Sequence, residues 1–501
     1  MSYATVQSCT LAGIAALPVT VEVHIGGGLP GMSIVGLPQS AVRESKDRVK
    51  AAIMHAELTY PMVKIVVNLA PADLPKQGGR FDLPIALGIL TATGQLPSDA
   101  LDNLVVVGEL GLMGQIRAVS GALPTALAFR QADCGLLMPA ANRMEASRSA
   151  RTKLYVADDL SVLFYQIKKR KLKPVRRERT ALNYASDNVV TAGDMSDVRG
   201  QVHARRALEI AAAGAHNLLM VGPPGTGKSM LASRMPTIQP EMSVLESMET
   251  ASIQSISHAG FDDADWGCRP FRSPHHTASG VALVGGGAKP MPGEISLAHN
   301  GVLFLDELSE FPRAVLDVLR EPMETGRINI SRAAKQCEFP ARFQLVAAMN
   351  PCPCGYLGDP DIQCRCTPDQ IARYAMRVSG PFLDRIDLHV PVQRITQGIL
   401  QTDERSESSK TVRDRVSNAR TKQLSRQKEL NRSLSGKALA KHTALNTESQ
   451  KLLNDAAEQL VLSLRAVHRV QRVARTIADL DNVDNITTQH VVEALSYRQR
   501  R

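Results

Sequence analysis

The 501-residue sequence has no apolar run that approaches the roughly 20 residues a helix needs to cross a bilayer. Its N-terminus lacks a basic segment followed by an apolar core, which is the pattern of a secretory signal. It contains no internal repeat and no long low-complexity tract. These absences argue against a membrane protein, a secreted protein and a repeat architecture, and they predict a globular, cytoplasmic protein with no membrane partner.

The charge of the sequence is the first feature that indicates a class of partner. The net charge is +10 and the isoelectric point is about 9.2, which favours anionic partners, nucleic acid first. Part of the excess lies in residues 168–179, a basic stretch with the character of a linker. Charge alone therefore leaves open that these residues are only solvated basic faces.

The length predicts several domains, because 501 residues exceed one ordinary hydrophobic core. We expect a strand-rich α/β domain over residues 1–167 and a basic linker over 168–190. Residues 191–396 carry the nucleotide-binding patterns described below, and residues 397–501 have a helical pattern rich in Arg, Lys and Gln.

Residues 222–229, Gly-Pro-Pro-Gly-Thr-Gly-Lys-Ser, follow a hydrophobic run ending at Val221 and precede a helical pattern. This is the strand, loop and helix context of a phosphate-binding P-loop, in which backbone N–H groups and a helix N-terminus face a polyphosphate. Lys228 is predicted to reach the β- and γ-phosphates, and Ser229 to hold Mg²⁺. The residues expected to bind ATP are Gly222, Pro223, Pro224, Gly225, Thr226, Gly227, Lys228 and Ser229. The sequence therefore predicts an ATP hydrolase.

Two further strand patterns end in polar residues. Residues 301–305 form an apolar run that ends in Asp306 and Glu307, and residues 343–349 end in Asn350. Ligands bind at the carboxyl ends of strands in open α/β sheets, so these side chains should face the P-loop. We expect Asp306 to support Mg²⁺, Glu307 to activate the attacking water, and Asn350 to help position it.

Arg385 precedes another apolar run and has two possible roles. An arginine supplied by a neighbouring subunit can stabilise charge during phosphoryl transfer. The alternative is a structural ion pair with Asp384 or Asp387. We favour the first role, which implies head-to-tail contacts between subunits that close into a ring.

Of the eight cysteines, four fall within fifteen residues: Cys352, Cys354, Cys364 and Cys366. In a reducing compartment such a cluster favours a metal over disulfides, and four thiolates suit a structural, tetrahedral Zn²⁺. The C-x-C spacing is tighter than the usual one, so four free thiols remain the alternative.

The order of P-loop, acid pair, asparagine, arginine and C-terminal helices resembles the AAA+ ATPases. Residues 269–277, 293–301 and 350–355 are similar to the magnesium-chelatase-like branch of that class, and the resemblance to its ComM/YifB type covers nearly the whole chain. The resemblance implies a hexameric ring with a helical lid, a helix-2 insertion, a pre-sensor hairpin and a DNA branch-migration activity. It also makes Arg465 the expected lid residue at the γ-phosphate, with Arg469 as the alternative.

Both implied insertions have matching sequence. Residues 285–293 are glycine-rich and predict a loop, and residues 326–336 predict a hairpin with basic residues near its tip. In related rings both insertions face the pore, so Lys289, Arg332 and Lys335 are candidate DNA phosphate contacts.

Residues 1–170 resemble the Lon-type protease domain without its catalytic residues. The segments that correspond to the nucleophile and lysine motifs are 78–84 and 119–124, and neither supplies the Ser or the Lys. Ser120 is nearby but has no base partner, so we predict no peptidase activity.

Three functions are consistent with these sequence features. The leading hypothesis is an ATP-driven DNA motor for branch migration or unwinding in recombination, as in uptake of transforming DNA, with possible recombination-protein partners. A metal-chelatase motor subunit is the second, although the sequence lacks an acidic metal-handling tract. The third is a protein-remodelling ring.

Overall fold

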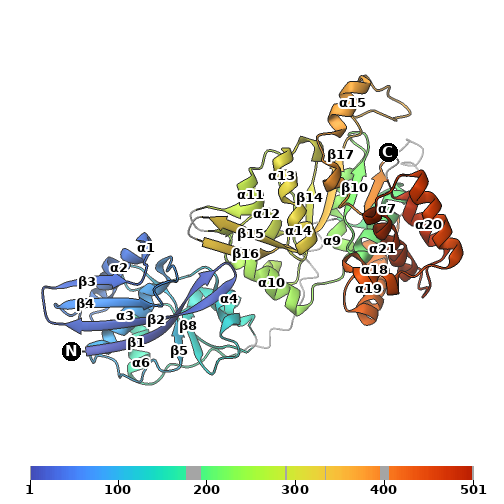
Figure 1. Ribbon diagram of the computed structural model, residues 1–501. Helices are drawn as coiled ribbons and strands as arrows, with labels where there is room; N and C mark the ends of the chain where they lie inside the picture. Colours follow the sequence, from blue (N-terminus) through green and yellow to red (C-terminus); the bar gives the residue numbers. More distant parts are fainter. Residues whose placement is uncertain are drawn as a thin grey trace. The chain divides into compact units, whose positions relative to one another are not determined.

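The computed structural model describes residues 2–149, 151–176, 193–287, 290–332, 335–394 and 406–498 (Figure 1). The chain divides into two compact units. The first comprises Met1–Asn183 together with Met248–Trp266, and the second comprises Tyr184–Ser247 and Gly267–Arg501. Met248–Trp266 thus groups with the N-terminal residues, although the sequence placed it among the nucleotide-binding residues 191–396.

The first unit is built on a seven-stranded mixed sheet with the order β3-β4-β2-β1-β5-β8-β9. Its antiparallel pairs are β1 with β2 and β2 with β4, and the remaining neighbours are parallel. The strands are β1 (Ser2–Ala12), β2 (Ala15–Gly26), β3 (Gly31–Val35), β4 (Lys64–Ala70), β5 (Leu104–Val106), β8 (Gly135–Pro139) and β9 (Lys153–Ala157). A separate short pair is formed by β6 (Glu109–Leu110) and β7 (Ile116–Arg117).

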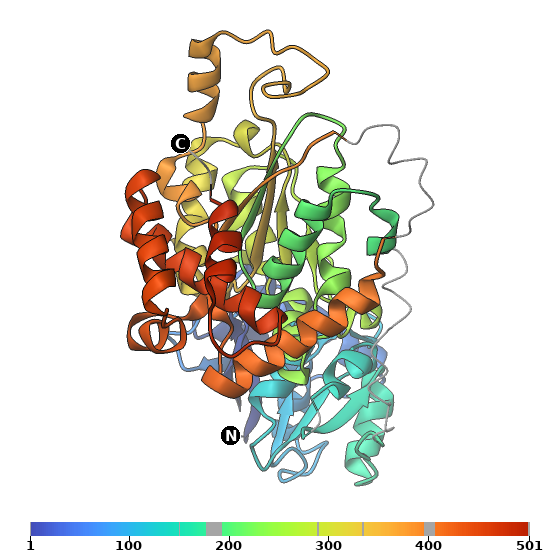
Figure 2. The same ribbon diagram turned by 90° about the vertical axis from the view of Figure 1, so that its right-hand side faces the viewer.

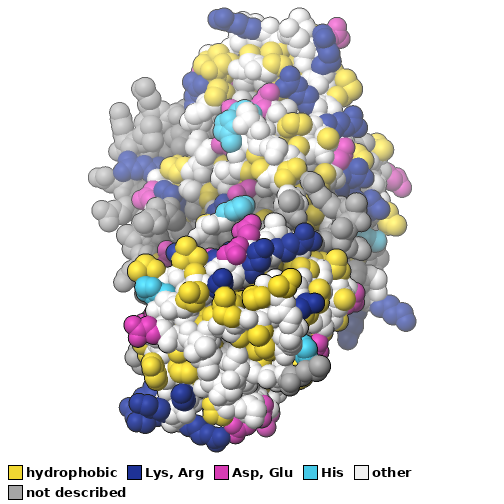
Figure 3. All heavy atoms as spheres, turned by 90° about the vertical axis from the view of Figure 1, so that its left-hand side faces the viewer, with side chains coloured by type: hydrophobic (Ala, Val, Ile, Leu, Met, Phe, Trp, Pro, Cys, Tyr) yellow, Lys and Arg dark blue, Asp and Glu magenta, His cyan; other side chains and the backbone are white. Residues whose placement is uncertain are grey.

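Helix α3 (Asp82–Ala92) forms the centre of this unit, because nearly all of its side chains are apolar and buried against β1 and β2. The other helices are α1 (Ser40–Arg43), α2 (Ser45–His55), α4 (Ala122–Ala128), α5 (Arg143–Ser147) and α6 (Leu160–Lys168). Figure 3 shows hydrophobic, basic and acidic side chains intermixed on one face of this unit. That face therefore indicates no particular partner.

Met248–Trp266 joins the first unit through a small apolar cluster and several polar contacts. Trp266 and Ala251 pack with Leu123 of α4. Arg148 forms an ion pair of 2.5 Å with Asp263 and lies over the Trp266 ring. Since these partners lie more than a hundred residues apart in the chain, local sequence patterns carry no signal for them.

The second unit contains a five-stranded parallel sheet with the order β11-β14-β17-β10-β18. Its strands are β11 (Phe271–Arg272), β14 (Val302–Leu305), β17 (Gln344–Met349), β10 (Leu218–Val221) and β18 (Leu388–Pro391). Helices and short turns connecting them are α7 (Val202–Gly214), α8 (Lys228–Ser233), α9 (Met235–Ile238), α10 (Val244–Ser255, which continues into the first unit), α11 (Gly280–Val284), α12 (Glu294–Leu297), α13 (Arg313–Val318), α14 (Arg320–Thr325), α15 (Pro368–Ala375) and α16 (Gly380–Leu383). The predicted strands at 301–305 and 343–349 are confirmed as β14 and β17.

The C-terminal helices lie beside this sheet (Figure 2), and most of them contribute buried apolar residues to the same hydrophobic core. They are α18 (Ser409–Gln427), α19 (Gly436–His442), α20 (Thr447–Gln459), α21 (Leu464–Leu480) and α22 (Thr488–Ser496). Both α18 and α21 pack against α7, and Arg420 of α18 donates two hydrogen bonds to the carbonyl of Ala212 in α7. The predicted combination of a parallel P-loop sheet and a C-terminal helical region is confirmed. In the part of the chain that the structure describes, no helix combines the length and apolar character needed to cross a membrane.

Candidate nucleotide site and cysteine cluster

The P-loop lies between β10 and α8, at the carboxyl end of a strand flanked by β17 and β18. Gly225 and Gly227 have φ angles of +76° and +84°, the left-handed region that side chains disfavour. A Cβ atom on Gly222 would lie 2.0 Å from the carbonyl oxygen of Val392, so only glycine fits there. The glycines of the motif are therefore required by the loop conformation and by the close approach of the β18 end.

Lys228 is buried beneath this loop. Its Nζ donates to the carbonyl oxygens of Gly222, at 2.7 Å, and Pro223, at 2.8 Å. It also lies 3.3 Å from Oδ1 of Asn350. Burial lowers the pKa of the Lys228 ammonium, while Asp306 and Glu307 act in the opposite direction. The structure thus brings together Lys228, Asn350 and the acid pair, as the sequence predicts.

Ser229 and Asp306 form a second contact across the sheet edge. The Ser229 hydroxyl donates to Oδ2 of Asp306 at 2.6 Å, and the other carboxylate oxygen accepts from the backbone N–H of Glu307 at 2.9 Å. Hydroxyl and carboxylate oxygens are hard ligands of the kind that Mg²⁺ prefers. The donor set therefore fits a magnesium ion held between α8 and the end of β14.

Glu307 follows directly, with a left-handed φ of +51° and an exposed side chain. Its Oε2 lies 3.1 Å from Nδ1 of His276. His276 belongs to the segment 269–277, which carries part of the family resemblance but no predicted role. Sequence reasoning missed this contact, because the strand before it, β11, has only two residues and no readable periodicity.

Arg385 lies apart from these groups. Its Nη2 is 2.7 Å from Oε1 of Glu324 at the end of α14, and its Nη1 donates to the carbonyl of Pro381. The partner within the chain is thus Glu324 and neither of the two aspartates weighed in the sequence. No contact among the described residues joins Arg385 to the P-loop or the acid pair of its own chain.

The two lid arginines differ in their surroundings. Ser463 caps α21 by accepting from the N–H of Ala466, and Arg465 on the first turn is exposed. Arg469, one turn later, is mostly buried and lies 3.4 Å from Oδ1 of Asp387. Burial alone would raise the pKa of Asp387, but Arg469 and His216 hold it below its usual range. Arg469 therefore takes part in a structural ion pair, whereas the Arg465 side chain is exposed.

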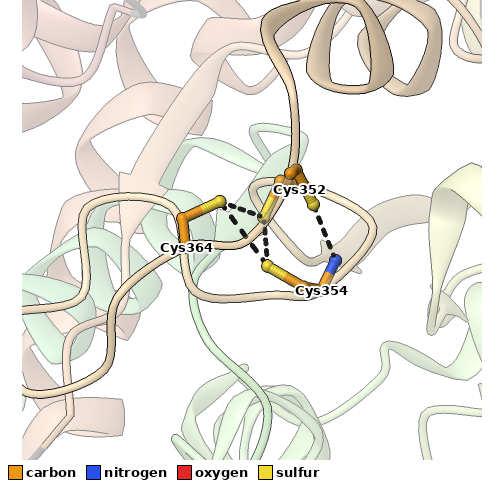
Figure 4. A group of neighbouring side chains, drawn as sticks. Cys352, Cys354 and Cys364 are labelled. Atoms are coloured by element: carbon orange, nitrogen blue, oxygen red, sulfur yellow. Dashed lines mark hydrogen bonds between the residues drawn. The ribbon is translucent and has the colours of Figure 1, made fainter.

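The four clustered cysteines converge in the loop between β17 and α15 (Figure 4). Their ligand atoms all lie within 4.8 Å of one another. The sulfur atoms of Cys352, Cys354 and Cys364 are separated by 3.4 to 3.7 Å, and the backbone N–H of Cys354 lies 3.4 Å from Sγ of Cys366. N–H donation from Tyr356 and Arg365 lowers the pKa of Cys354 to about 6. The donor set fits a closed four-thiolate site for Zn²⁺.

This cysteine loop also touches the P-loop. Gly355 has a φ of +87°, and a Cβ atom there would lie 2.7 Å from Cδ of Pro224. Asn350, which contacts Lys228, precedes Cys352 by two residues. The candidate metal site is therefore continuous with the wall of the nucleotide site.

The candidate DNA contacts lie on the two insertions. Residues 327–332 and 335–340 form the antiparallel strands β15 (Arg327–Arg332) and β16 (Lys335–Pro340), which confirms the predicted hairpin. Arg332 and Lys335 are opposite each other in the backbone register, at the far end of this hairpin. The glycine-rich stretch contains the two-residue strands β12 (Gly285–Gly286) and β13 (Met291–Pro292), and Lys289 lies outside the described residues.

In the first unit, the segments compared with a protease site have other contacts. Arg80 is buried and donates to the Thr125 hydroxyl at 3.1 Å. Asp82 accepts from Arg48 at 2.7 Å and from Ser45, while Ser120 is exposed. The Arg80 and Asp82 side chains thus connect α2, α3 and α4.

A five-stranded parallel P-loop sheet, an acid pair and asparagine at its carboxyl edge, and a C-terminal helical region together define an AAA+ domain. Residues 194–400 match the family described as magnesium chelatase, subunit ChlI. Residues 406–498 match the C-terminal part of that subunit, and residues 21–142 match a further family described as subunit ChlI of Mg-chelatase.

Curated relatives extend this similarity over the full chain. The sequence is 49% identical over 503 residues to competence protein ComM of Haemophilus influenzae, covering 99% of this chain and 98% of the relative. It is 47% identical to the protein YifB of Escherichia coli over 99% of this chain and 97% of the relative. Magnesium-chelatase subunit ChlI of Cyanophora paradoxa is 22% identical over 41% of this chain and 53% of its own length. The chain belongs to the ComM/YifB type of magnesium-chelatase-like AAA+ proteins.

Proposed function

We propose that this protein is an ATP-driven DNA motor that promotes branch migration or unwinding during recombination, in the cytoplasm of a naturally transformable cell. The supporting observation is that the P-loop, the acid pair and Asn350 meet at one sheet edge, in a chain 49% identical over 503 residues to a competence protein. Competence concerns uptake of DNA, and the +10 net charge suits a nucleic-acid partner.

In this proposal the P-loop amides and Lys228 bind the β- and γ-phosphates, and Ser229 and Asp306 hold Mg²⁺. Glu307 accepts a proton as the water oxygen attacks the γ-phosphorus and the bond to the β–γ bridging oxygen breaks, releasing ADP. Asn350 orients the same water. Arg465 approaches the γ-phosphate from the lid.

Arg385 is the proposed contribution of a neighbouring subunit. To contact the ATP bound by another chain, the Arg385 guanidinium must leave the Glu324 carboxylate and bind a phosphate oxygen instead. The Glu324 side chain is half exposed. Head-to-tail contacts of this kind close into a ring, and a hexamer is proposed from the family. DNA would then contact Lys289, Arg332 and Lys335 in the ring pore.

A labelled four-way DNA junction tests the function directly. The wild-type protein is expected to convert the junction into product duplexes only with ATP and Mg²⁺, and Glu307→Gln is expected to abolish conversion. Binding without conversion by the wild-type protein would contradict the branch-migration activity. ATP hydrolysis that responds to a porphyrin-binding partner or a protein client, and not to DNA, would replace the proposal with a chelatase or remodelling function.

Charge reversal at the hairpin tip, Arg332→Glu with Lys335→Glu, is expected to remove most of the stimulation of ATP hydrolysis by DNA. Each lost phosphate contact should also make the salt dependence of DNA binding less steep by about one unit of slope. Lys437→Glu with Lys441→Glu, which changes two exposed lysines of α19, controls for net charge. Unchanged stimulation in the hairpin variant would exclude these two residues as DNA contacts.

The cysteine cluster is proposed to hold one structural Zn²⁺. Protein purified without chelators is expected to contain about one zinc per chain, measured by elemental mass spectrometry of the acid-digested protein. Cys364→Ser should lose it, whereas Cys337→Ser, which changes a cysteine outside the cluster, should retain it. A wild-type protein without zinc after growth in zinc-supplemented medium would contradict the assignment.

A further inference from the structure

Glu307 has a backbone conformation that depends on support from the surrounding structure. Its φ of +51° lies in the left-handed region, which is uncommon for residues other than glycine. Such conformations persist only where neighbouring contacts enforce them, and they cluster at active sites. Because the direction of a side chain is coupled to the conformation of its backbone, the contacts that enforce this conformation also determine where the Glu307 carboxylate points.

A short 3-10 turn over residues 308–310 follows this glutamate directly. The backbone N–H of Glu310 donates to the Glu307 carbonyl at 2.8 Å and closes the turn. Leu308 is fully buried and Ser309 is 3% exposed, although the Glu307 side chain is exposed. The position of the glutamate therefore depends on the buried side chains of the two residues that follow it.

Helix α15, which projects from the second unit, supplies a partner for Ser309 (Figure 1). The Ser309 hydroxyl donates to the Tyr374 hydroxyl at 2.6 Å, and Tyr374 is 6% exposed. Arg377, just beyond the helix, lies over the Tyr374 ring and donates to both carboxylate oxygens of Glu310, at 2.8 and 2.9 Å. Exposed ion pairs of this kind contribute little, so the buried hydroxyl pair is the stronger of these two links between α15 and the turn.

The same helix begins at the cysteine cluster. Cys366 directly precedes Thr367, whose hydroxyl accepts the backbone N–H of Gln370 and caps α15. The Gln370 side chain in turn accepts the Thr367 N–H at 2.9 Å, which completes a capping box. The segment that contains the four cysteines therefore meets the nucleotide site at two places, with Gly355 beside the P-loop and Tyr374 at the turn after the acid pair.

We infer that Tyr374 is a positioning residue for ATP hydrolysis. Its hydroxyl holds Ser309, and the turn that contains Ser309 keeps Glu307 in its left-handed conformation. That conformation directs the Glu307 carboxylate toward the attacking water. This inference rests on the proposed function, because it deepens the role given to Glu307.

Tyr374→Phe tests the inference by removing only the hydroxyl. We expect kcat for ATP hydrolysis to fall about tenfold, because the conformation of Glu307 loses a buried contact that enforces it. Binding of a fluorescent ATP analogue should stay within about twofold, since the residues proposed to bind the phosphates are unchanged. Tyr356→Phe is the matched control in the cysteine loop, because it also loses a phenol hydroxyl and keeps the ring over which Arg394 lies.

A double variant separates positioning from stability. Tyr374→Phe leaves the buried Ser309 hydroxyl unpaired and should lower the melting temperature, and adding Ser309→Ala removes that hydroxyl and should restore much of the loss. The hydrogen bond is still absent in the double variant, so its kcat should remain about tenfold below that of the wild type. Ser309→Ala alone should lower kcat by a similar factor, because both single substitutions remove the same contact.

The outcomes distinguish the inference from the function on which it rests. Undiminished turnover in Glu307→Gln would refute the proposed role of Glu307 and the proposed function with it. An inactive Glu307→Gln combined with wild-type kcat in Tyr374→Phe would refute only the inference. Recovery of kcat together with the melting temperature in the double variant would also refute it, since Tyr374 would then act on stability alone. A kcat that stays low at a restored melting temperature would support the positioning role.

Discussion

Replacing Lys228 with alanine is expected to lower ATP turnover by about 10²- to 10³-fold, the usual cost of deleting one preorganised donor from a buried catalytic site. The reason lies in what surrounds the ammonium. Its hydrogen-bond partners are two backbone carbonyls of the P-loop and the Asn350 amide oxygen, all neutral acceptors. A polyphosphate is a stronger, charged acceptor, so the ammonium gains a stronger partner when ATP replaces them.

Steady-state hydrolysis and titration with a fluorescent ATP analogue together test this prediction. Both turnover and affinity should fall in Lys228→Ala, since the phosphates are contacted before and during the reaction. Ser233→Ala is the matched control on the same helix, because its hydroxyl donates to the Met230 carbonyl, at 2.8 Å, and the site does not use it. Turnover in Lys228→Ala within about threefold of the control would mean that this loop does not bind the reacting phosphates, and the proposed function would fail with it.

The nucleotide-binding residues could be predicted because each one is marked by a contiguous pattern. The P-loop is eight consecutive residues, and Asp306, Glu307 and Asn350 each end an apolar run. A parallel sheet then brings them together without further information, since the carboxyl ends of β10, β14 and β17 share one edge. The Ser229–Asp306 contact is the direct result.

Contacts that depend on tertiary geometry could not be predicted in this way. Arg385 has two aspartates beside it in the sequence, yet its partner Glu324 lies on α14. His276 reaches Glu307 only because β11 pairs with β14. The grouping of Met248–Trp266 with the first unit depends on side chains from α4 and on Arg148, just after α5, which lie more than a hundred residues earlier. In each case the partners are far apart in sequence and no periodic pattern marks them.

The second large effect that we expect is on ATP affinity, and it comes from a substitution in the cysteine loop. Gly355→Ala should weaken ATP binding by about 30-fold, equivalent to about 2 kcal/mol for forcing an added methyl group into a packed contact. Its Cβ would meet Pro224 of the P-loop at 2.7 Å, and its φ of +87° already disfavours a side chain. The loop must then shift away from the P-loop or displace it, and either change moves Asn350 relative to Lys228.

Gly358→Ala separates this contact from backbone strain. Gly358 has a similar φ of +80° in the same loop, but an added Cβ there meets nothing within 4 Å. It should therefore share the conformational penalty of a left-handed residue and keep ATP affinity near that of the wild type. Zinc content should be the same in both variants, because all four thiolates remain. Equal ATP affinities would show that the Pro224 contact is unimportant, whereas a selective loss in Gly355→Ala at full zinc content would show that the cysteine loop shapes the nucleotide site through packing.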